Sequence, residues 1–336
     1  MSDPSISDSA DESLAEASAP RQNPYGAFAL RTALGLAVVA LLAHYDGRAV
    51  FHALARERLG YFFAAIALYI ASQVMSSWRW QLLARLNSIP GPFREYLAYY
   101  FVGVFTNLFV PGLVGGDAAR ALYLGRRHDR LADAIASVVA DRGIGLLALF
   151  GFAAGCALTM RTVTLPPSVL RVTVIIGAVA LAGWLTSPLL ARIVPRLGGG
   201  FARFVEPVLP YMRRPLALIP AIVLSIALQI ALATCQYLLA RGLGLRISLP
   251  TFLLCVPIAN VFASLPITLN GLGVREAAYV VLFGYAGVTR PDTIALGLLW
   301  FASTMLGGLT GIYAFITTRV PVPAADDIRE NDTSRE

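Results

Sequence analysis

The sequence contains no lysine, and only 14% of its 336 residues are charged. A soluble domain of this length normally carries about a quarter charged residues. Hydrophobic residues make up 57% of the chain, and the mean hydropathy is +0.67. The scarcity of charge, together with several apolar runs long enough to cross a bilayer, predicts an all-α polytopic membrane protein.

Residues that bind metals or form disulfides are also scarce. The three cysteines, Cys156, Cys235 and Cys255, lie in apolar segments without a CxxC spacing. The three histidines form no ligand pattern, and metalloprotease, P-loop and nucleophile-elbow motifs are absent. The arginines are spread over loops instead of forming one face, which argues against nucleic-acid binding. We therefore expect no cofactor, no metal and no enzyme active site.

Six apolar spans are predicted to cross the membrane: 27–43, 61–78, 131–158, 171–190, 216–240 and 293–317. Two further apolar segments, 94–125 and 249–288, are interrupted by proline and glycine. We predict that each is a re-entrant hairpin made of a broken helix. Residues 1–24 have no signal-peptide pattern. They and residues 321–336 are predicted to be disordered cytoplasmic tails on either side of a membrane domain at 25–320.

The two interrupted segments share the pattern Pro-x4-Gly-x3-Arg. The first reads PGLVGGDAAR and ends at Arg120, and the second reads PITLNGLGVR and ends at Arg275, 155 residues later. The same offset carries predicted spans onto one another, which predicts a repeat with halves at about 61–158 and 216–317. If both segments are hairpins, the halves are inverted relative to each other. If each segment is a single crossing, the halves are parallel.

Loop arginines give the predicted orientation. With re-entrant hairpins, the stretches around Arg85, Arg127 and 192–214 lie on one side of the membrane and hold most of the loop charge. An excess of positive charge marks the cytoplasmic side. We therefore predict a multi-pass protein of the cytoplasmic membrane with both termini in the cytoplasm. Trp78 and Trp80 are predicted to anchor the chain at the interface.

Arg120 and Arg275 are the strongest candidates for a functional role. A charged side chain at membrane depth is costly, so it normally faces a partner or a wet cavity. Each arginine follows a glycine break and lies near the start of a resumed helix, where unpaired N–H groups favour an anion. The planar guanidinium group suits phosphate, and a lipid phosphate is the expected anion. The alternative is that each arginine snorkels to its interface and contacts bulk lipid.

The polar residues at the two breaks have simpler expected roles. Asp117 is expected to cap a helix that begins at Ala118. Asn107 and Asn270 are expected to satisfy backbone groups that the breaks leave free. Direct contact of these residues with a ligand is the alternative.

Asp141 and Arg142 lie inside an apolar run. Neighbours in a helix point about 100° apart, so we expect Asp141 to neutralise Arg120 or Arg142 across helices, and Glu276 is the candidate counter-charge for Arg275. Asp141 is also a candidate proton site. The full predicted substrate-binding set is Arg120, Arg275, Gly115, Gly116, Asp117, Asn107, Gly271, Asn270, Glu276, Asp141 and Arg142.

Three stretches carry a family resemblance when taken together: SWRW at 77–80, NLFVPGLVGGDAAR at 107–120 and SVVADRG at 137–143. The segment ending NGLGVRE at 270–276 fits the same pattern. The chain resembles the membrane region of lysylphosphatidylglycerol synthetase/flippases and their stand-alone relatives over about residues 25–320. The resemblance implies movement of a lipid or lipid-linked headgroup between leaflets. Fused members also have a soluble aminoacyl transfer domain, and we expect no lysyl transfer here.

The leading hypothesis is a translocase for a phospholipid or a polyprenyl- or glycolipid-linked headgroup. Its anionic phosphate would sit between the two hairpins, held by Arg120 and Arg275. The alternative is a non-catalytic accessory subunit that presents lipid to a partner enzyme of lipid biosynthesis. A membrane-embedded transferase is a third hypothesis, which no nucleophile–base pairing supports. A homo-oligomer is compatible with all three hypotheses.

Overall fold

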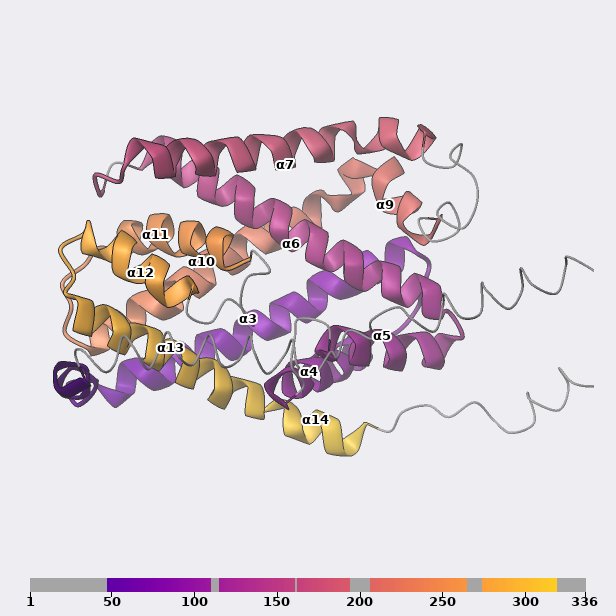
Figure 1. Ribbon diagram of the computed structural model, residues 1–336. Coiled ribbons are helices and arrows are strands. Elements are labelled where there is room, and N and C mark those ends of the chain that lie inside the picture. The colour runs from indigo at the N-terminus through magenta and orange to yellow at the C-terminus, as the bar shows by residue number, and fades with distance from the viewer. Residues whose placement is uncertain (1–46, 110–114, 161, 194–205, 265–273, 319–336) are drawn as a thin grey trace, which may run out of the picture.

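The computed structural model describes residues 47–109, 115–160, 162–193, 206–264 and 274–318, and the regular structure in these ranges is helical (Figure 1). Five segments of the described chain are long and apolar enough to cross a membrane. They are α3 (Leu59–Leu86), α6 (Leu131–Thr159), α7 (Pro167–Ile193), η3 with α10 (Pro215–Gly242), and α13 with α14 (Arg290–Thr317). Five of the six predicted spans are thus confirmed as candidate spans, and the remaining one, 27–43, lies outside the described residues.

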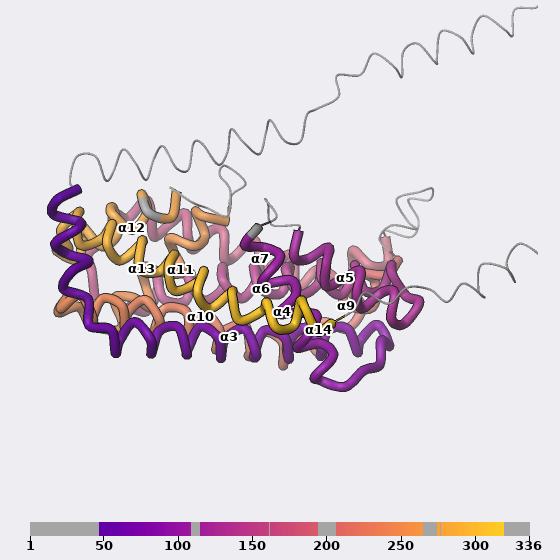
Figure 2. Tube along the Cα trace, turned by 90° about the horizontal axis from the view of Figure 1, so that it is seen from below, coloured from indigo at the N-terminus to yellow at the C-terminus, as the bar shows by residue number. Residues whose placement is uncertain are grey.

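The long helices run lengthwise through the molecule (Figures 1 and 2). At 1.5 Å per residue, the 28 residues of α3 extend about 42 Å, more than the hydrocarbon core of a bilayer. Helices α3 and α10 (Ile219–Gly242) pack side by side in opposite directions, because Arg58 N–H, just before α3, donates to the carbonyl of Gly242, the last residue of α10, at 3.2 Å. Helix α7 lies along α6 on the outside of the bundle (Figure 1).

Two shorter helices, α4 (Phe93–Phe109) and α5 (Gly115–His128), form the first antiparallel pair. The rings of Tyr99 and Tyr123 are 5.5 Å apart, and Glu95 contacts His128 at 3.0 Å near the ends remote from the break. Nearer the break, a Cβ atom on Gly103 would lie 2.7 Å from the carbonyl oxygen of Gly116. This separation is too short for any side chain, so glycine at this position lets the two backbones approach closely.

A second antiparallel pair is formed by α11 (Leu249–Ala263) and α12 (Val274–Gly284). The ring centroids of Phe252 and Phe283 are 4.9 Å apart, and the thiol of Cys255 lies 4.0 Å from the carbonyl oxygen of Leu282. In both views the α11–α12 pair lies at one end of the bundle and the α4–α5 pair at the other (Figures 1 and 2). Both predicted interrupted segments are therefore helix pairs, each displaced toward a different end.

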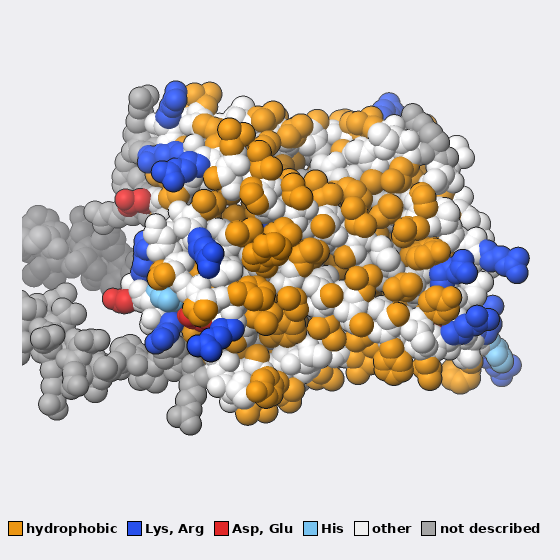
Figure 3. Space-filling view, turned by 180° about the vertical axis from the view of Figure 1, so that it is seen from behind, with side chains coloured by type: hydrophobic (Ala, Val, Ile, Leu, Met, Phe, Trp, Pro, Cys, Tyr) orange, Lys and Arg blue, Asp and Glu red, His pale blue; other side chains and the backbone are white. Residues whose placement is uncertain are grey.

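The surface between the two ends is apolar. Basic side chains gather at both ends of the molecule, and hydrophobic side chains cover the region between them (Figure 3). Large aliphatic side chains point outward there, including Val139, Ile175, Val179 and Val223, each more than half exposed. A soluble protein rarely exposes a contiguous apolar patch of this extent. The belt is the surface expected for contact with lipid tails.

The buried core extends through both ends. A large cluster around Phe252, Tyr279 and Phe283 lies within the α11–α12 pair and its neighbours, and a second cluster around Trp80 and Tyr96 lies beside α4 and α5. Trp80 is fully buried, so its predicted place at the interface is wrong, whereas Trp78 is 51% exposed. The reason is that α3 continues to Leu86, eight residues past the predicted end of the span, and turns Trp80 toward α4.

The remaining short elements join the long helices at the α4–α5 end. They are a helical segment of two parts, η2 (Glu206–Val208) and α9 (Leu209–Arg213), followed by η3 (Pro215–Leu218). The side-chain amide of Asn87, just after α3, donates to the carbonyl of Pro207 at 2.8 Å, and Arg130 donates to the carbonyl of Ser88 at 2.8 Å. The end of α3, the start of α6 and the segment before α10 therefore meet at the same end of the bundle.

Candidate functional site: a buried arginine–aspartate network

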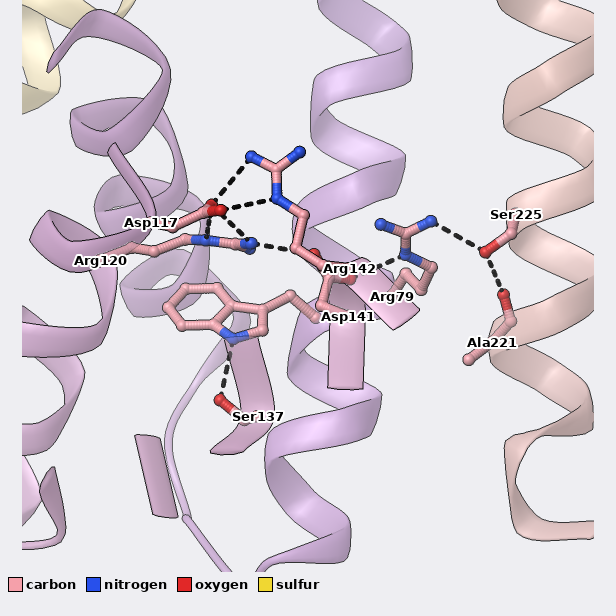
Figure 4. A network of polar contacts seen from close by, with 9 residues as sticks. Arg79, Asp117, Arg120, Ser137, Asp141, Arg142, Ala221 and Ser225 are labelled. Carbon is pink, nitrogen blue, oxygen red and sulfur yellow. Dashed lines mark hydrogen bonds and ion pairs between the residues drawn. The ribbon is translucent and has the colours of Figure 1, made fainter. Parts of the chain in front are cut away.

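Asp141 lies at the centre of a network of polar side chains within the bundle (Figure 4). It belongs to α6 and is 1% exposed. One carboxylate oxygen accepts from Arg79 Nε of α3 at 2.8 Å, and the other accepts from Arg120 Nη2 of α5 at 3.0 Å. Each oxygen thus has its own guanidinium group, which is the arrangement that lets a carboxylate remain charged away from water.

Asp117 provides the second carboxylate and binds two arginines. Its Oδ1 atom lies 3.1 Å from Arg120 Nε, and Arg142 reaches it from α6 with Nε at 2.6 Å from Oδ2 and Nη2 at 3.0 Å from Oδ1. Arg142 therefore binds Asp117 through two parallel hydrogen bonds, the fork geometry that guanidinium groups use for carboxylates and phosphates. The Arg142 side chain is 49% exposed, unlike that of Arg120, which is 3% exposed.

Aromatic rings hold Arg120 in position. Its guanidinium carbon lies 5.0 Å from the ring centroid of Trp80 and 5.0 Å from that of Tyr100, a distance that gives cation–π attraction. Trp80 is fixed in turn by a 3.0 Å hydrogen bond from its indole N–H to Ser137 Oγ. Among the described contacts, the Nη1 atom of Arg120 is buried without a hydrogen-bond partner. Within the described ranges, Arg120 thus keeps one donor without an acceptor.

The network reaches from the first half of the chain to the second through Arg79. Arg79 Nη1 donates to Ser225 Oγ of α10 at 2.8 Å, and Ser225 donates to the carbonyl of Ala221 at 2.7 Å. Four helices, α3, α5, α6 and α10, therefore meet at this set of side chains. Any relative movement of these helices must rearrange its hydrogen bonds.

The network carries an excess of positive charge. Three arginines, Arg79, Arg120 and Arg142, face two aspartates, which leaves a formal charge of 3 − 2 = +1. Charges inside a protein or a membrane are strongly destabilising unless they are paired. The excess lies nearest the exposed edge at Arg142, where an anion can approach. The geometry is suited to binding an oxyanion there.

The residues at the first break support the start of α5. Asn107 Oδ1 accepts from Gly116 N–H at 2.8 Å, so the predicted role of Asn107 toward the backbone is confirmed. A Cβ atom on Gly116 would collide with the carbonyl oxygen of Gly103, which excludes any side chain there. Helix α5 begins at Gly115, so Asp117 is inside the first turn and does not cap a helix that starts at Ala118. Its carboxylate is directed to the arginines instead.

The pairing of Asp141 differs partly from expectation. It pairs with Arg120, as one of the two alternatives predicted, and also with Arg79, whereas Arg142 pairs with Asp117. Arg79 lies one residue beyond the predicted span 61–78, but α3 continues through it to Leu86 and buries its side chain, which corrects the predicted end of that span. Arg79 lies in WRWQLLARL, and the leucines that follow continue the apolar helix. Its place within a helix was therefore readable from the sequence.

The described contacts of the network include none of the predicted residues of the second half. Arg275 lies in the first turn of α12, partly buried, and is not among the described contacts of the network residues. Asn270 and Gly271 lie outside the described residues, as does the side chain of Glu276. The described site is thus formed mainly by the first half, with Ser225 as the contribution of the second.

A separate groove of about 440 Å³ runs along the exposed face of α3. Its lining is mainly apolar and consists of Ala71, Val74, Met75, Trp78, Gln81 and Phe93. It includes none of the network residues, so it is not part of the arginine–aspartate site. In the described ranges, no group of three or more histidine, cysteine or acidic side chains is placed to hold a metal ion.

Comparison with known families gives a match over most of this chain. The family model described as lysylphosphatidylglycerol synthase TM region matches residues 28–311, most of the chain. No curated protein and no solved structure gives a significant match. The match includes every residue of the network, from Arg79 to Ser225.

Replacing Asp141 by asparagine tests the stability of the network. Asp141→Asn leaves Arg79 and Arg120 buried beside a neutral side chain, and we expect it to destabilise the fold by about 3–5 kcal/mol. Asp133→Asn is the matched control, because Asp133 pairs with Arg130 at 2.9 Å at a partly exposed site, and we expect it to cost below about 1 kcal/mol. Thermal unfolding of the purified protein in detergent measures both. Equal unfolding midpoints for the two variants would contradict the role of Asp141.

Proposed function

The chain belongs to the lysylphosphatidylglycerol synthase transmembrane-region family, and on that premise we propose that it moves an anionic lipid between the leaflets of the cytoplasmic membrane. The observation that carries the proposal is the cationic network within the apolar bundle. Its excess charge lies beside Arg142, whose side chain is half exposed while its neighbours are buried. A phosphate-bearing headgroup would neutralise this excess charge, while the acyl chains remain in the surrounding lipid.

The arrangement of the helices supports an inverted repeat. Arg275 follows Arg120 by 155 residues, and adding 155 to α3 (59–86) gives 214–241, against Pro215–Gly242 for the corresponding segment. Adding 155 to α4 (93–109) gives 248–264, against Leu249–Ala263 for α11. The antiparallel packing of α3 and α10, and the location of the two helix pairs at opposite ends, favour halves of opposite orientation. Inverted halves of this kind are typical of transporters.

We propose that the two pairs, α4–α5 and α11–α12, are re-entrant hairpins that enter from opposite faces. Arg85, Arg126, Arg127, Arg213 and Arg214 belong to segments that meet at the α4–α5 end. These positive charges support a cytoplasmic location for that end. Helix α14 ends on the same side (Figure 1), which supports a cytoplasmic C-terminus. An even number of crossings, with the predicted span at 27–43 included, would also give a cytoplasmic N-terminus.

Transport requires that the headgroup site open to each face in turn. Arg79 connects the first-half network to α10 through Ser225. Helix α14 packs so closely against α4 that a Cβ atom on Gly311 would collide with the carbonyl oxygen of Phe101. The two halves are therefore joined at both places, and a shift of one against the other changes the surroundings of Asp141 and Arg142. We propose that this relative movement exposes the headgroup alternately to the two leaflets.

Cysteine labelling tests the hairpin topology. We expect Arg85→Cys and Arg127→Cys to react with a membrane-impermeant maleimide only from the cytoplasmic side, and Arg246→Cys and Tyr285→Cys only from the outside. All four positions are exposed, and the three native cysteines are buried and are replaced in the background. If positions 85 and 127 react from opposite sides, α4 and α5 form a single crossing and the inverted repeat is wrong.

Lipid exchange in proteoliposomes tests the function. We expect the full chain to exchange labelled phosphatidylglycerol or labelled polyprenyl phosphate between leaflets, and Arg142→Gln to slow that exchange by about tenfold or more. The fold should tolerate this change, because Asp117 keeps its contact with Arg120. The control is Arg130→Gln, which removes another partly exposed arginine–aspartate pair and should leave the rate within about twofold of the original. Absence of exchange of both lipids by folded protein would favour an accessory subunit that presents lipid to a partner enzyme.

A further inference from the structure

Asp117 occupies the position that a phosphate would take on Arg142. Its two oxygens lie 2.6 and 3.0 Å from Nε and Nη2 of Arg142, in the two-bond geometry that guanidinium groups also form with phosphate oxygens. The same carboxylate accepts from Arg120 Nε at 3.1 Å. An incoming oxyanion can therefore bind side-on through Nε and Nη2 of Arg142 only by displacing Asp117.

The two carboxylates of the network differ in how easily they can be displaced. Asp141 is 2% exposed in its side chain and has one buried arginine on each oxygen. Asp117 is 15% exposed, and one of its two arginines is the half-exposed Arg142. Asp117 also lies in the first turn of α5, two residues after the helix begins at Gly115. Asp117 is thus the carboxylate at the open edge, and Asp141 is the structural one.

We propose that Asp117 is a built-in competitor for the phosphate of the transported lipid, holding Arg142 and Arg120 until the headgroup displaces it. This inference rests on the proposed function and states how the lipid headgroup is released. The phosphate binds by taking the hydrogen bonds of Arg142 from Asp117, and Asp117 returns as the headgroup leaves. The competition keeps binding weak enough for release into the opposite leaflet. It also keeps Arg142 paired when no lipid is present, which avoids an unpaired charge near the membrane interior.

The test compares Asp117→Asn with Asp133→Asn in purified full-length protein. Both variants remove one negative charge from an arginine–aspartate pair, but Asp133 pairs with Arg130 outside the network. The probes are dioctanoyl phosphatidylglycerol and inorganic phosphate, with binding measured in detergent by calorimetry. We expect Asp117→Asn to bind the lipid about tenfold more tightly than the original protein, because a competitor has been removed. Asp133→Asn should leave the lipid affinity within about twofold.

Leaflet exchange provides a second readout that a purely structural role would not produce. We expect Asp117→Asn to exchange labelled phosphatidylglycerol more slowly although it binds the lipid more tightly, because release is now slow. Arg142→Gln should lower both binding and exchange. Unfolding midpoints of the variants exclude loss of fold as the cause, and Asp117→Ser provides a second substitution that also removes the carboxylate.

The outcomes separate this inference from the proposed function. If the original protein binds the lipid through Arg142 and Asp117→Asn binds it no more tightly, Asp117 orients the arginine and does not compete, and the inference is wrong. If neither protein binds the lipid, the headgroup site itself is wrong. If Asp117→Asn binds inorganic phosphate more tightly but not the lipid, the anion that displaces Asp117 is not a lipid phosphate, and the inference is wrong.

Discussion

The pairing of one buried carboxylate with two guanidinium groups is the interaction on which the rest of this structure depends. Asp141 binds Arg79 from α3 and Arg120 from α5. Without it, Arg79 would lose its carboxylate partner and Arg120 would keep only Asp117. Removing one member of a buried ion pair is far more costly than the pair's own net stabilisation, because the remaining charge has lost its compensation. The registers of α3, α5 and α6 are therefore fixed relative to one another at this depth. Through Ser225, the same contact also fixes α10.

The polar edge beside Asp141 follows from this constraint. Once Asp141 and the aromatic rings of Trp80 and Tyr100 have positioned Arg120, Asp117 is held close enough to receive Arg142 as well. A buried, neutral centre thus supports a half-exposed cation at the boundary with lipid. A site for a phosphate headgroup needs this combination, since a fully buried arginine is inaccessible and a fully exposed one is screened by water.

Much of this architecture could be predicted from the sequence, because membrane spans are determined by the length and apolarity of local segments. The two breaks could also be predicted from the local sequence, because proline and glycine mark them. Polar residues in apolar surroundings were identified in the same way: Asn107, Asp117, Arg120, Asp141 and Arg142. The partners were harder to predict, since helical periodicity gives the direction of a side chain but not the helix that it meets. Arg79 was not predicted as a site residue for that reason, because its two partners lie 62 and 146 residues further along the chain. Burial of Trp80 likewise depends on α4, which its own segment does not reveal.

The central claim is that a lipid phosphate reaches the edge of the network at Arg142. The most direct measurement is the site of covalent labelling by a phosphatidylglycerol analogue with a photoreactive group on its headgroup, determined by peptide mass spectrometry in proteoliposomes. The account predicts labelling of α5 and α6 near Asp117 and Arg142, and loss of that labelling in Arg142→Gln. Labelling confined to the charged ends of the bundle, and unchanged in Arg142→Gln, would contradict it.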